Sequence, residues 1–287
     1  MALVVVPESS ADGGDRALVP LQHLPADQSL LYLLGKQVID NRYSSTVIVE
    51  TDDPAIPVSC SGTLIHSRLV LTAGHCVCGW RETFLAEGDK QLLIDSTACA
   101  SRAKVTAIRY EPAEDGAWSV MHVRHHEGEV RPHPDFKLLR SKRPPAVTSY
   151  ANLAVILLDE PDSLKLPIAT SAKADVQASA PLIIAGYGNN RLVPAPFGYR
   201  YAKKGKAQST LPSLDGKVLF EPEGTYLHES HQGWACFREN STGRQLVGIV
   251  GLGTETELSF TSTYFYRDWI RTELRRAAHS PSHDELK

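Results

Sequence analysis

A histidine beside a cysteine, at the end of an apolar stretch, is the first candidate for chemistry in this sequence. Residues 60–76 read CSGTLIHSRLVLTAGHC: an apolar strand, a polar turn, a second apolar strand and a tight Ala-Gly corner that presents His75. Imidazole has an ordinary pKa close to neutral pH, so a histidine presented in this way is a candidate for proton transfer. Cys60 and Cys76 lie at the two ends of the segment.

This segment closely resembles the histidine block of the trypsin/chymotrypsin family of serine peptidases. In that family the histidine of Thr-Ala-Gly-His-Cys is the general base. The resemblance implies that role for His75, and it implies a disulfide between Cys60 and Cys76. Further markers follow in the family's order from about residue 44 to residue 274. The implied fold is all-β, with two packed six-stranded antiparallel β-barrels, a C-terminal α-helix and an active cleft between the barrels.

Composition limits the classes of partner. The 287 residues suit one large all-β domain or two small ones, and the net charge of −3 gives no argument for nucleic acid. No apolar run reaches the length of a membrane span, and the start does not read as a secretory signal. A Cys60–Cys76 disulfide would instead suit an oxidising compartment, so the localisation stays open. Five cysteines leave at least one unpaired, and Cys78 and Cys99 are a second candidate pair.

The resemblance divides the chain into three parts. Residues 1–43 are an N-terminal extension that is partly flexible, residues 44–276 form the double-barrel domain, and residues 277–287 are a C-terminal tail. Within the extension, residues 27–35 read as a short capped helix. Residues 110–128 look like an insertion in the domain.

Two basic stretches could be read as binding sites. The insertion holds three histidines, but no ligating cysteine or carboxylate pattern accompanies them, so we expect a solvated basic loop and predict no metal and no cofactor. Residues 200–206, RYAKKGK, are predicted to form a basic loop or edge strand with a solvated face. The three histidines are His122, His125 and His126.

The position of the family's buried acid is the most informative one in the chain. The family has Asp followed by Ile-Ala-Leu-Leu, whereas this chain has Asn152 followed by Leu-Ala-Val-Ile-Leu-Leu. The acid holds the histidine in the correct tautomer and stabilises the imidazolium, and replacing it with Asn costs about 10⁴-fold in turnover, or roughly 5.5 kcal/mol. Asn152 can still orient the ring of His75, but it cannot supply the charge.

The nucleophile block has also changed. The family's Gly-Asp-Ser-Gly-Gly-Pro corresponds to HESHQG at residues 228–233. Ser230 is the predicted nucleophile, and the backbone N–H groups of His228 and Ser230 are the predicted oxyanion hole. An imidazole at His228 is expected to crowd the substrate, because the family uses glycine where the backbone must come close. The alternative is that Ser230 is an ordinary loop serine.

The predicted substrate pocket carries no charge. Gly224 stands where trypsin has the acid that selects Arg and Lys, and Gly251 and Gly253 lie on the predicted substrate edge. A trypsin-like preference for basic residues is therefore not expected.

Two functions follow from this pattern. The first is a catalytically inactive or strongly impaired peptidase homologue that acts by binding a protein or peptide. The alternative is an active serine endopeptidase that uses a dyad of His75 and Ser230 supported by Asn152, without trypsin-like specificity. A third reading, other chemistry by His228, Glu229 or His231, has no pattern behind it.

Overall fold

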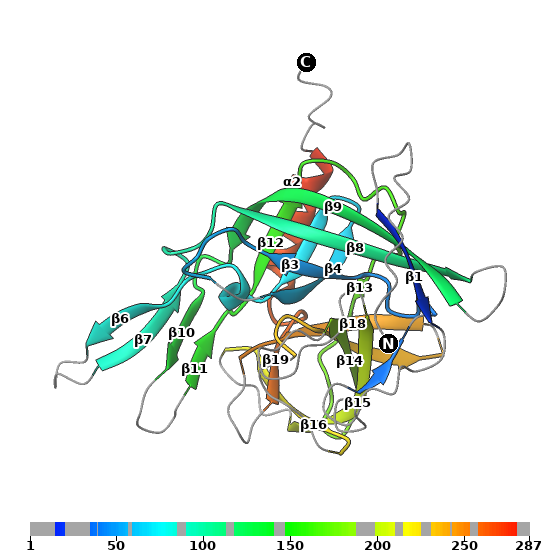
Figure 1. Ribbon diagram of the computed structural model, residues 1–287. Helices are drawn as coiled ribbons and strands as arrows, with labels where there is room; N and C mark the ends of the chain where they lie inside the picture. Colours follow the sequence, from blue (N-terminus) through cyan, green and yellow to red (C-terminus); the bar gives the residue numbers. More distant parts are fainter. Residues whose placement is uncertain are drawn as a thin grey trace.

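The computed structural model shows a molecule built mostly of strands, and the described residues include one long helix near the C-terminus (Figure 1). This helix, α2 (Arg267–His279), lies beside the first of two barrels. The structure describes residues 15–20, 35–38, 40–56, 59–84, 90–112, 118–140, 147–187, 199–209, 215–224, 231–241, 243–252 and 258–279. None of the helices in these ranges is long and apolar enough to cross a membrane.

The first barrel is a closed ring of six antiparallel strands. Its order is β9-β12-β5-β4-β3-β8, and pairing between β8 and β9 closes the ring. Valine, isoleucine and leucine fill the strands nearest the histidine block, which suits a pleated surface buried on the barrel side. The strands are β3 (Thr46–Glu50), β4 (Cys60–His66), β5 (Leu69–Thr72), β8 (Arg102–Pro112), β9 (Trp118–Pro132) and β12 (Ala154–Leu158).

The second barrel repeats this design. Its ring is β18-β17-β14-β15-β16-β19, closed by pairing between β18 and β19. The predicted fold of two six-stranded antiparallel barrels with a C-terminal helix is therefore confirmed. The strands are β14 (Pro181–Tyr187), β15 (Arg200–Ser209), β16 (Lys217–Pro222), β17 (Ala235–Asn240), β18 (Gly243–Val250) and β19 (Leu258–Ser262), and the short β13 (Thr170–Ser171) adds a parallel pair to β18.

Two N-terminal strands lie outside the rings. β1 (Asp15–Pro20) pairs with β9 of the first barrel, and β2 (Lys36–Gln37) pairs with β15 of the second. Segments from the predicted extension thus add to both barrels. The helix expected at residues 27–35 falls almost entirely outside the described residues.

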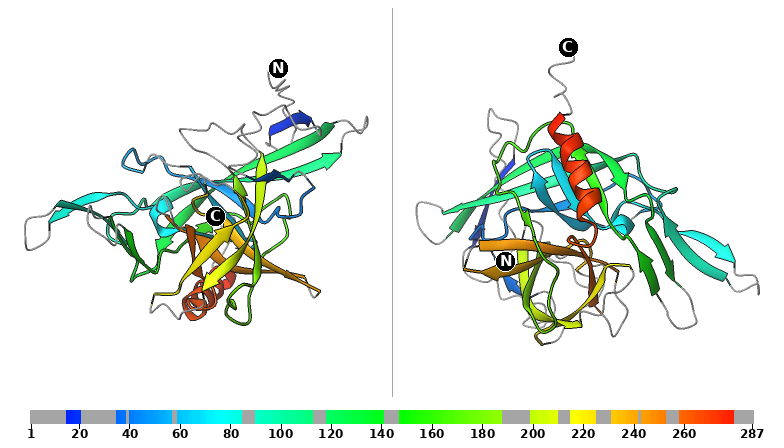
Figure 2. Two further views of the ribbon diagram at one scale, coloured as in Figure 1. Left: turned by 90° about the horizontal axis from the view of Figure 1, so that it is seen from below. Right: turned by 180° about the vertical axis from the view of Figure 1, so that it is seen from behind.

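A four-stranded sheet, which we call the arm, projects from the first barrel. Its strands are β6 (Arg81–Phe84), β7 (Lys90–Asp95), β10 (Lys137–Arg140) and β11 (Val147–Tyr150), in the order β11-β10-β7-β6. The arm and the β8–β9 hairpin extend in opposite directions (Figures 1 and 2). A disulfide between Cys78 and Cys99, the second candidate pair, joins the two ends of the β6–β7 hairpin.

The expected loop at residues 110–128 is instead largely strand. Residues 118–128 belong to β9, of which residues 119–128 pair along β8, and Met121 and Val123 are buried against the second barrel. Apolar residues alternate with the polar ones here, which allows one face to be buried. The three histidines turn to three separate partners: His122 to Glu111, His125 to Thr106 and His126 to Asp162.

The prediction of a basic loop or edge strand at residues 200–206 is wrong. These residues begin β15, an interior strand between β14 and β16. Arg200 is fully buried and donates hydrogen bonds to Thr46, the Ile108 carbonyl and the Tyr187 hydroxyl. Burial also lowers the pKa of Lys203 to about 8. Within residues 200–206, alternation along the strand leaves only Lys204 and Lys206 exposed.

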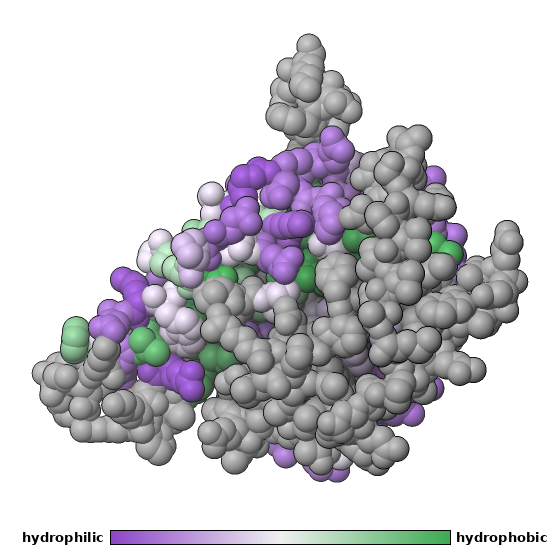
Figure 3. All heavy atoms as spheres, viewed as in Figure 1, coloured by the Kyte–Doolittle hydropathy of each residue, from purple (hydrophilic) through white to green (hydrophobic). Residues whose placement is uncertain are grey.

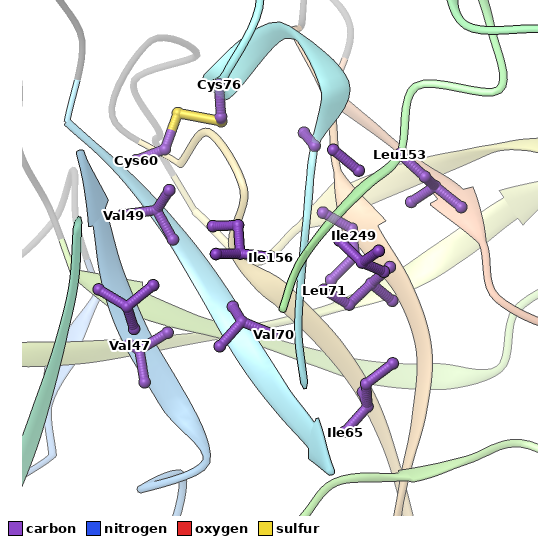
Figure 4. Close-up of a cluster of buried hydrophobic side chains, with 14 of the residues drawn as sticks. Val47, Val49, Cys60, Ile65, Val70, Leu71, Cys76, Leu153, Ile156 and Ile249 are labelled. Atoms are coloured by element: carbon purple, nitrogen blue, oxygen red, sulfur yellow. A yellow bond between two sulfur atoms is a disulfide. The ribbon is translucent and has the colours of Figure 1, made fainter. Parts of the chain in front are cut away.

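The apolar core reaches the histidine block. The disulfide between Cys60 and Cys76 closes one end of a cluster that includes Val49, Val70 and Ile156 (Figure 4). Helix α2 covers the first barrel through buried residues such as Ile270, whereas Phe265 precedes the helix and is 45% exposed. Hydrophilic residues cover much of the described surface on the face shown in Figure 3.

Candidate active site

His75 is presented by a tight turn directly after strand β5. The turn is the 3₁₀ helix η1 (Gly74–Cys76), which begins one residue after a buried alanine. Glycine is required at position 74 because an added Cβ would lie 2.8 Å from the ring of Phe136. The disulfide joins Cys60 to Cys76 with their α-carbons 5.8 Å apart, as expected from the histidine block.

Asn152 lies against His75, as expected for the residue in the acid's position. Its Oδ1 accepts a hydrogen bond from the backbone N–H of His75 at 3.1 Å and lies 3.1 Å from ring atom Nδ1. Its Nδ2 is 3.0 Å from the same ring atom. The amide therefore serves either tautomer of the ring, since its oxygen accepts from Nδ1–H and its nitrogen donates to a bare Nδ1.

The turn that carries Asn152 is tied to the helix and to the second barrel. The Tyr266 hydroxyl accepts a hydrogen bond from the Ala151 N–H at 3.0 Å and donates one to the Asp215 carbonyl at 2.8 Å. Ala151 has a φ of 45°, in the left-handed region that an alanine rarely adopts. These contacts hold Asn152 in place beneath the ring of His75.

Gln232 is a site residue that the sequence analysis did not single out. Its side chain hydrogen-bonds the ring of His75, and its Oε1 lies 3.9 Å from Cys60 Sγ. The available signal was the replacement of a small family glycine by a long amide two residues after the predicted serine. The imidazole is thus held between two neutral amides.

The ring of His75 is almost completely shielded from water. The residue is 5% exposed, and burial lowers its pKa to about 4, although the hydrogen bonds to Asn152 and Gln232 act to raise it. His75 is therefore neutral at pH 7. Among the described residues that touch this ring, none supplies a negative charge that would stabilise an imidazolium.

The predicted nucleophile and oxyanion hole lie outside the described residues. These are Ser230 and His228, and their roles stay predictions. His231, the next residue, is fully buried and packs edge-on against Trp234, with ring centroids 4.4 Å apart. The residue after His231 contacts the first barrel. The backbone N–H of Ser61 donates a hydrogen bond to the carbonyl of Gln232, 3.0 Å away.

Of the three predicted pocket glycines, Gly251 lies beside the candidate site, and the substrate role of all three stays a prediction. Gly251 lies against Asn152, because a Cβ added to it would be 3.1 Å from Nδ2. The two residues line a cavity of about 10 Å³, enough for no more than one water molecule. Gly224 does not line this cavity, and Gly253 lies outside the described residues.

The histidine block itself offers a group of metal-binding atoms. Cys60, His75 and Cys76 place two sulfur atoms and a ring nitrogen within 4.8 Å of one another, and all three residues are buried. In the structure the two cysteines are joined to each other.

Comparison with known protein families gives the same identification as the fold and the site geometry. Residues 36–204, more than half of the chain, match the family model named Trypsin. The chain belongs to the trypsin family. A comparison with curated proteins gave no match.

Solved structures of family members share the architecture at low sequence identity. Neuropsin, a serine protease from mouse brain, is 16% identical with a TM-score of 0.58, and the alignment covers 84% of this chain and 99% of neuropsin. A double mutant of human heparin binding protein (CAP37) is 15% identical with a TM-score of 0.59, covering 87% and 99%. Similarity at this level shows a shared fold.

We predict that the stability of the protein depends strongly on Gly233, which lies where the two barrels meet. Its φ is +73°, and an added Cβ would lie 2.0 Å from the Ser61 carbonyl oxygen. Gly224 has nearly the same φ, +72°, but open space around an added Cβ. We expect Gly233→Ala to destabilise the protein by more than about 3 kcal/mol and Gly224→Ala by only about 1 kcal/mol, the strain of the dihedral alone. Urea unfolding of both variants measures the difference, and equal losses would contradict the close approach.

The buried imidazole predicts a loss of stability in mild acid. The pKa of His75 is about 4 in the folded state and about 6.5 when exposed, so the unfolded state binds more protons between these values. Its contribution is therefore complete above pH 6.5 and is lost as the pH falls toward 4, by up to ~3 kcal/mol. Urea unfolding at pH 7 and at pH 4.5 should show a larger loss for the wild type than for His75→Gln. NMR titration of the ring near pH 6.5 would contradict the prediction.

Proposed function

We propose that this chain is a catalytically inactive or strongly impaired member of the trypsin family that acts by binding a protein or peptide. The single observation that carries the proposal is the placement of His75 between the neutral side chains of Asn152 and Gln232. This placement would reduce peptidase activity in three ways. It provides no negative charge to stabilise an imidazolium, it leaves the tautomer of the His75 ring unfixed, and it obstructs the nucleophile.

The missing charge weakens the general base. A histidine that takes a serine proton becomes an imidazolium, and in the family a buried aspartate stabilises that cation. Asn152 supplies a dipole in its place, and the ring is buried, so the cation is stabilised neither by a carboxylate nor by water. The loss of the acid alone is worth about 10⁴-fold in rate.

The tautomer is no longer fixed. A carboxylate accepts only, so it selects the tautomer with the proton on Nδ1 and the lone pair on Nε2. Asn152 presents both an acceptor and a donor to Nδ1, at 3.1 and 3.0 Å. Part of the population then carries its proton on Nε2, where it cannot accept one from a serine.

We infer that Gln232 obstructs the ring nitrogen that a nucleophile would need, because Asn152 already engages the other one. With Asn152 at Nδ1, the Gln232 amide is the second side chain that hydrogen-bonds the imidazole. A catalytic serine would have to displace this amide before it could transfer its proton. The predicted loss of the family's glycines around Ser230 adds a further cost, about 10²–10³-fold for each oxyanion donor that is lost.

The arm supports a binding role. Three aromatic side chains stand exposed at or near its strands: Trp80 at 38%, Phe84 at 67% and Tyr150 at 48%. Large aromatic residues are enriched at protein interfaces, where they bury much area at a low cost in side-chain entropy. One solved relative is named for a binding activity, heparin binding protein, which is consistent with a non-enzymatic use of the fold.

The alternative is an active endopeptidase that uses a dyad of His75 and Ser230. The sequence observation in its favour is that both residues remain in the family's positions although their surroundings have changed. Under this alternative Gln232 moves aside when substrate binds and Asn152 orients the ring, with no preference for Arg or Lys.

Reaction with a fluorophosphonate probe separates the two functions. We expect slow labelling of the wild type that is no faster than that of Ser230→Ala. We also expect Asn152→Asp alone to give less than about tenfold improvement, because Gln232 still holds the ring. Asn152→Asp with Gln232→Gly should exceed the product of the two separate gains, since catalytic groups that act as a unit are non-additive.

The controls for this experiment carry Ser230→Ala in each background. Rapid labelling of the wild type that disappears in Ser230→Ala would refute the proposal of inactivity. Recovery of about 10⁴-fold from Asn152→Asp alone would show that Gln232 does not obstruct the site.

The proposed binding surface has its own test. Phe84 and Ile168 are both exposed, at 67% and 49%, but only Phe84 lies on the arm. We expect peptides selected from a random library on the immobilised protein to lose at least about tenfold in affinity with Phe84→Ser, as expected for an aromatic contact residue. Ile168→Ser should leave the affinity unchanged. Equal affinity of the selected peptides for both variants and the wild type would exclude the arm as the surface.

A further inference from the structure

Three potential metal ligands meet in the histidine block. They are the sulfur atoms of Cys60 and Cys76 and a ring nitrogen of His75, all within 4.8 Å of one another. No other group of three metal-binding side chains gathers this closely in the described ranges. We propose that reduction of the Cys60–Cys76 disulfide converts this group into a zinc-binding site.

The distances suit zinc after a small movement of the sulfur atoms. Tetrahedral zinc with Zn–S of about 2.3 Å and Zn–N of about 2.0 Å places sulfur and nitrogen ligands ~3.6 Å apart. Cys76 Sγ already lies 3.9 Å from Nε2 of His75. Two sulfur ligands on tetrahedral zinc lie about 3.8 Å apart, a separation that side-chain rotation can supply once the disulfide is broken.

Asn152 orients the ring for a metal. A metal-bound histidine normally donates its other ring N–H to a carboxylate or carbonyl oxygen, which fixes both the tautomer and the ring plane. Oδ1 of Asn152 lies 3.1 Å from Nδ1, in position to accept that proton. The tautomer that results carries its lone pair on Nε2, the atom next to Cys76 Sγ.

The fourth ligand position falls beside Gln232. Its Oε1 lies 3.9 Å from Cys60 Sγ, and its side chain hydrogen-bonds the ring of His75. The amide oxygen is a neutral ligand. Two thiolates, a neutral imidazole and a neutral amide around Zn²⁺ give a complex with no net charge.

The net charge of the zinc complex affects its stability because the site is buried. His75 is 5% exposed, and Cys60, Cys76 and Asn152 are 2% or less. An uncompensated charge in such a place is costly, whereas a neutral complex is not. An aspartate at position 152, as in the family's active members, would give the same group a net charge of −1. The amide at Asn152 therefore weakens the peptidase and favours the metal.

The chemical steps balance with an external reductant. A thiol or phosphine reductant gives two electrons and the solvent gives two protons, so the disulfide becomes two thiols while the reductant is oxidised. Zinc then displaces the two thiol protons as the Zn–S bonds form. While zinc is bound, the disulfide cannot reform and Nε2 of His75 cannot accept a proton.

The test is a metal titration of the full chain under anaerobic conditions, with Co²⁺ as the spectroscopic probe and Zn²⁺ as its competitor. Protein reduced with a phosphine should bind one Co²⁺, with a thiolate charge-transfer band and the strong visible bands of tetrahedral cobalt, and Zn²⁺ should remove both signals. The oxidised protein should show neither. Asn152→Ala should lower the affinity about 10–100-fold, and His75→Ala should lower it further.

A matched control separates this site from the second disulfide. The double variant Cys78→Ser with Cys99→Ser should keep the full signal, and Cys60→Ser with Cys76→Ser should lose it. If reduction unfolds the protein, Zn²⁺ should restore the far-ultraviolet circular dichroism of the β-fold, because the metal binds the folded state. No tetrahedral signal from folded reduced protein, no refolding by Zn²⁺, or a signal that survives loss of Cys60 and Cys76 would each overturn the proposal.

Discussion

The contact of the two barrels at Ser61 is the constraint on which the site depends. Ser61 is fully buried, and its N–H donates to the carbonyl of Gln232 across the junction. Its hydroxyl accepts from the N–H of Tyr187 at 2.9 Å, and its carbonyl accepts from the Thr72 hydroxyl at 2.7 Å. Every polar atom of Ser61 thus takes part in a hydrogen bond. Because the residue is small, the backbones of the two barrels can come close together.

That approach requires glycine on the side of the second barrel. A Cβ added to Gly233 or to Gly186 would lie within 2.8 Å of Ser61 atoms. The close packing carries Gln232 to the ring of His75, which is 5% exposed. The low pKa of His75 follows from this burial.

Burial of this degree explains why an amide suits position 152. Asn152 is 1% exposed, so a carboxylate there would be an unpaired buried charge whenever His75 is neutral. An active enzyme tolerates that cost because the charge lowers the barrier of its reaction. A chain that binds without catalysis gains stability from the neutral side chain, as expected when activity and stability oppose each other.

The sequence predicted the features that family markers carry, including the two-barrel fold, and failed in a segment that has no marker. The histidine block, its disulfide and the contact of Asn152 with His75 follow one contiguous motif and one family marker, and these are the parts that the structure reproduces. Residues 200–206 carry a basic composition typical of surface, yet they pair between two strands far away in the sequence. No local pattern shows that Arg200 will be buried.

The contact of the Gln232 side chain with His75 could not be predicted from the sequence either. A glutamine in a loop has several rotatable bonds, and only the packing of the barrels determines that its amide meets an imidazole. Because Asn152 supports both tautomers, the group that meets Nε2 decides which state of His75 prevails. A serine hydroxyl and a metal ion therefore compete for the lone pair on this nitrogen atom. The proposed metal site and the alternative peptidase activity exclude each other at His75.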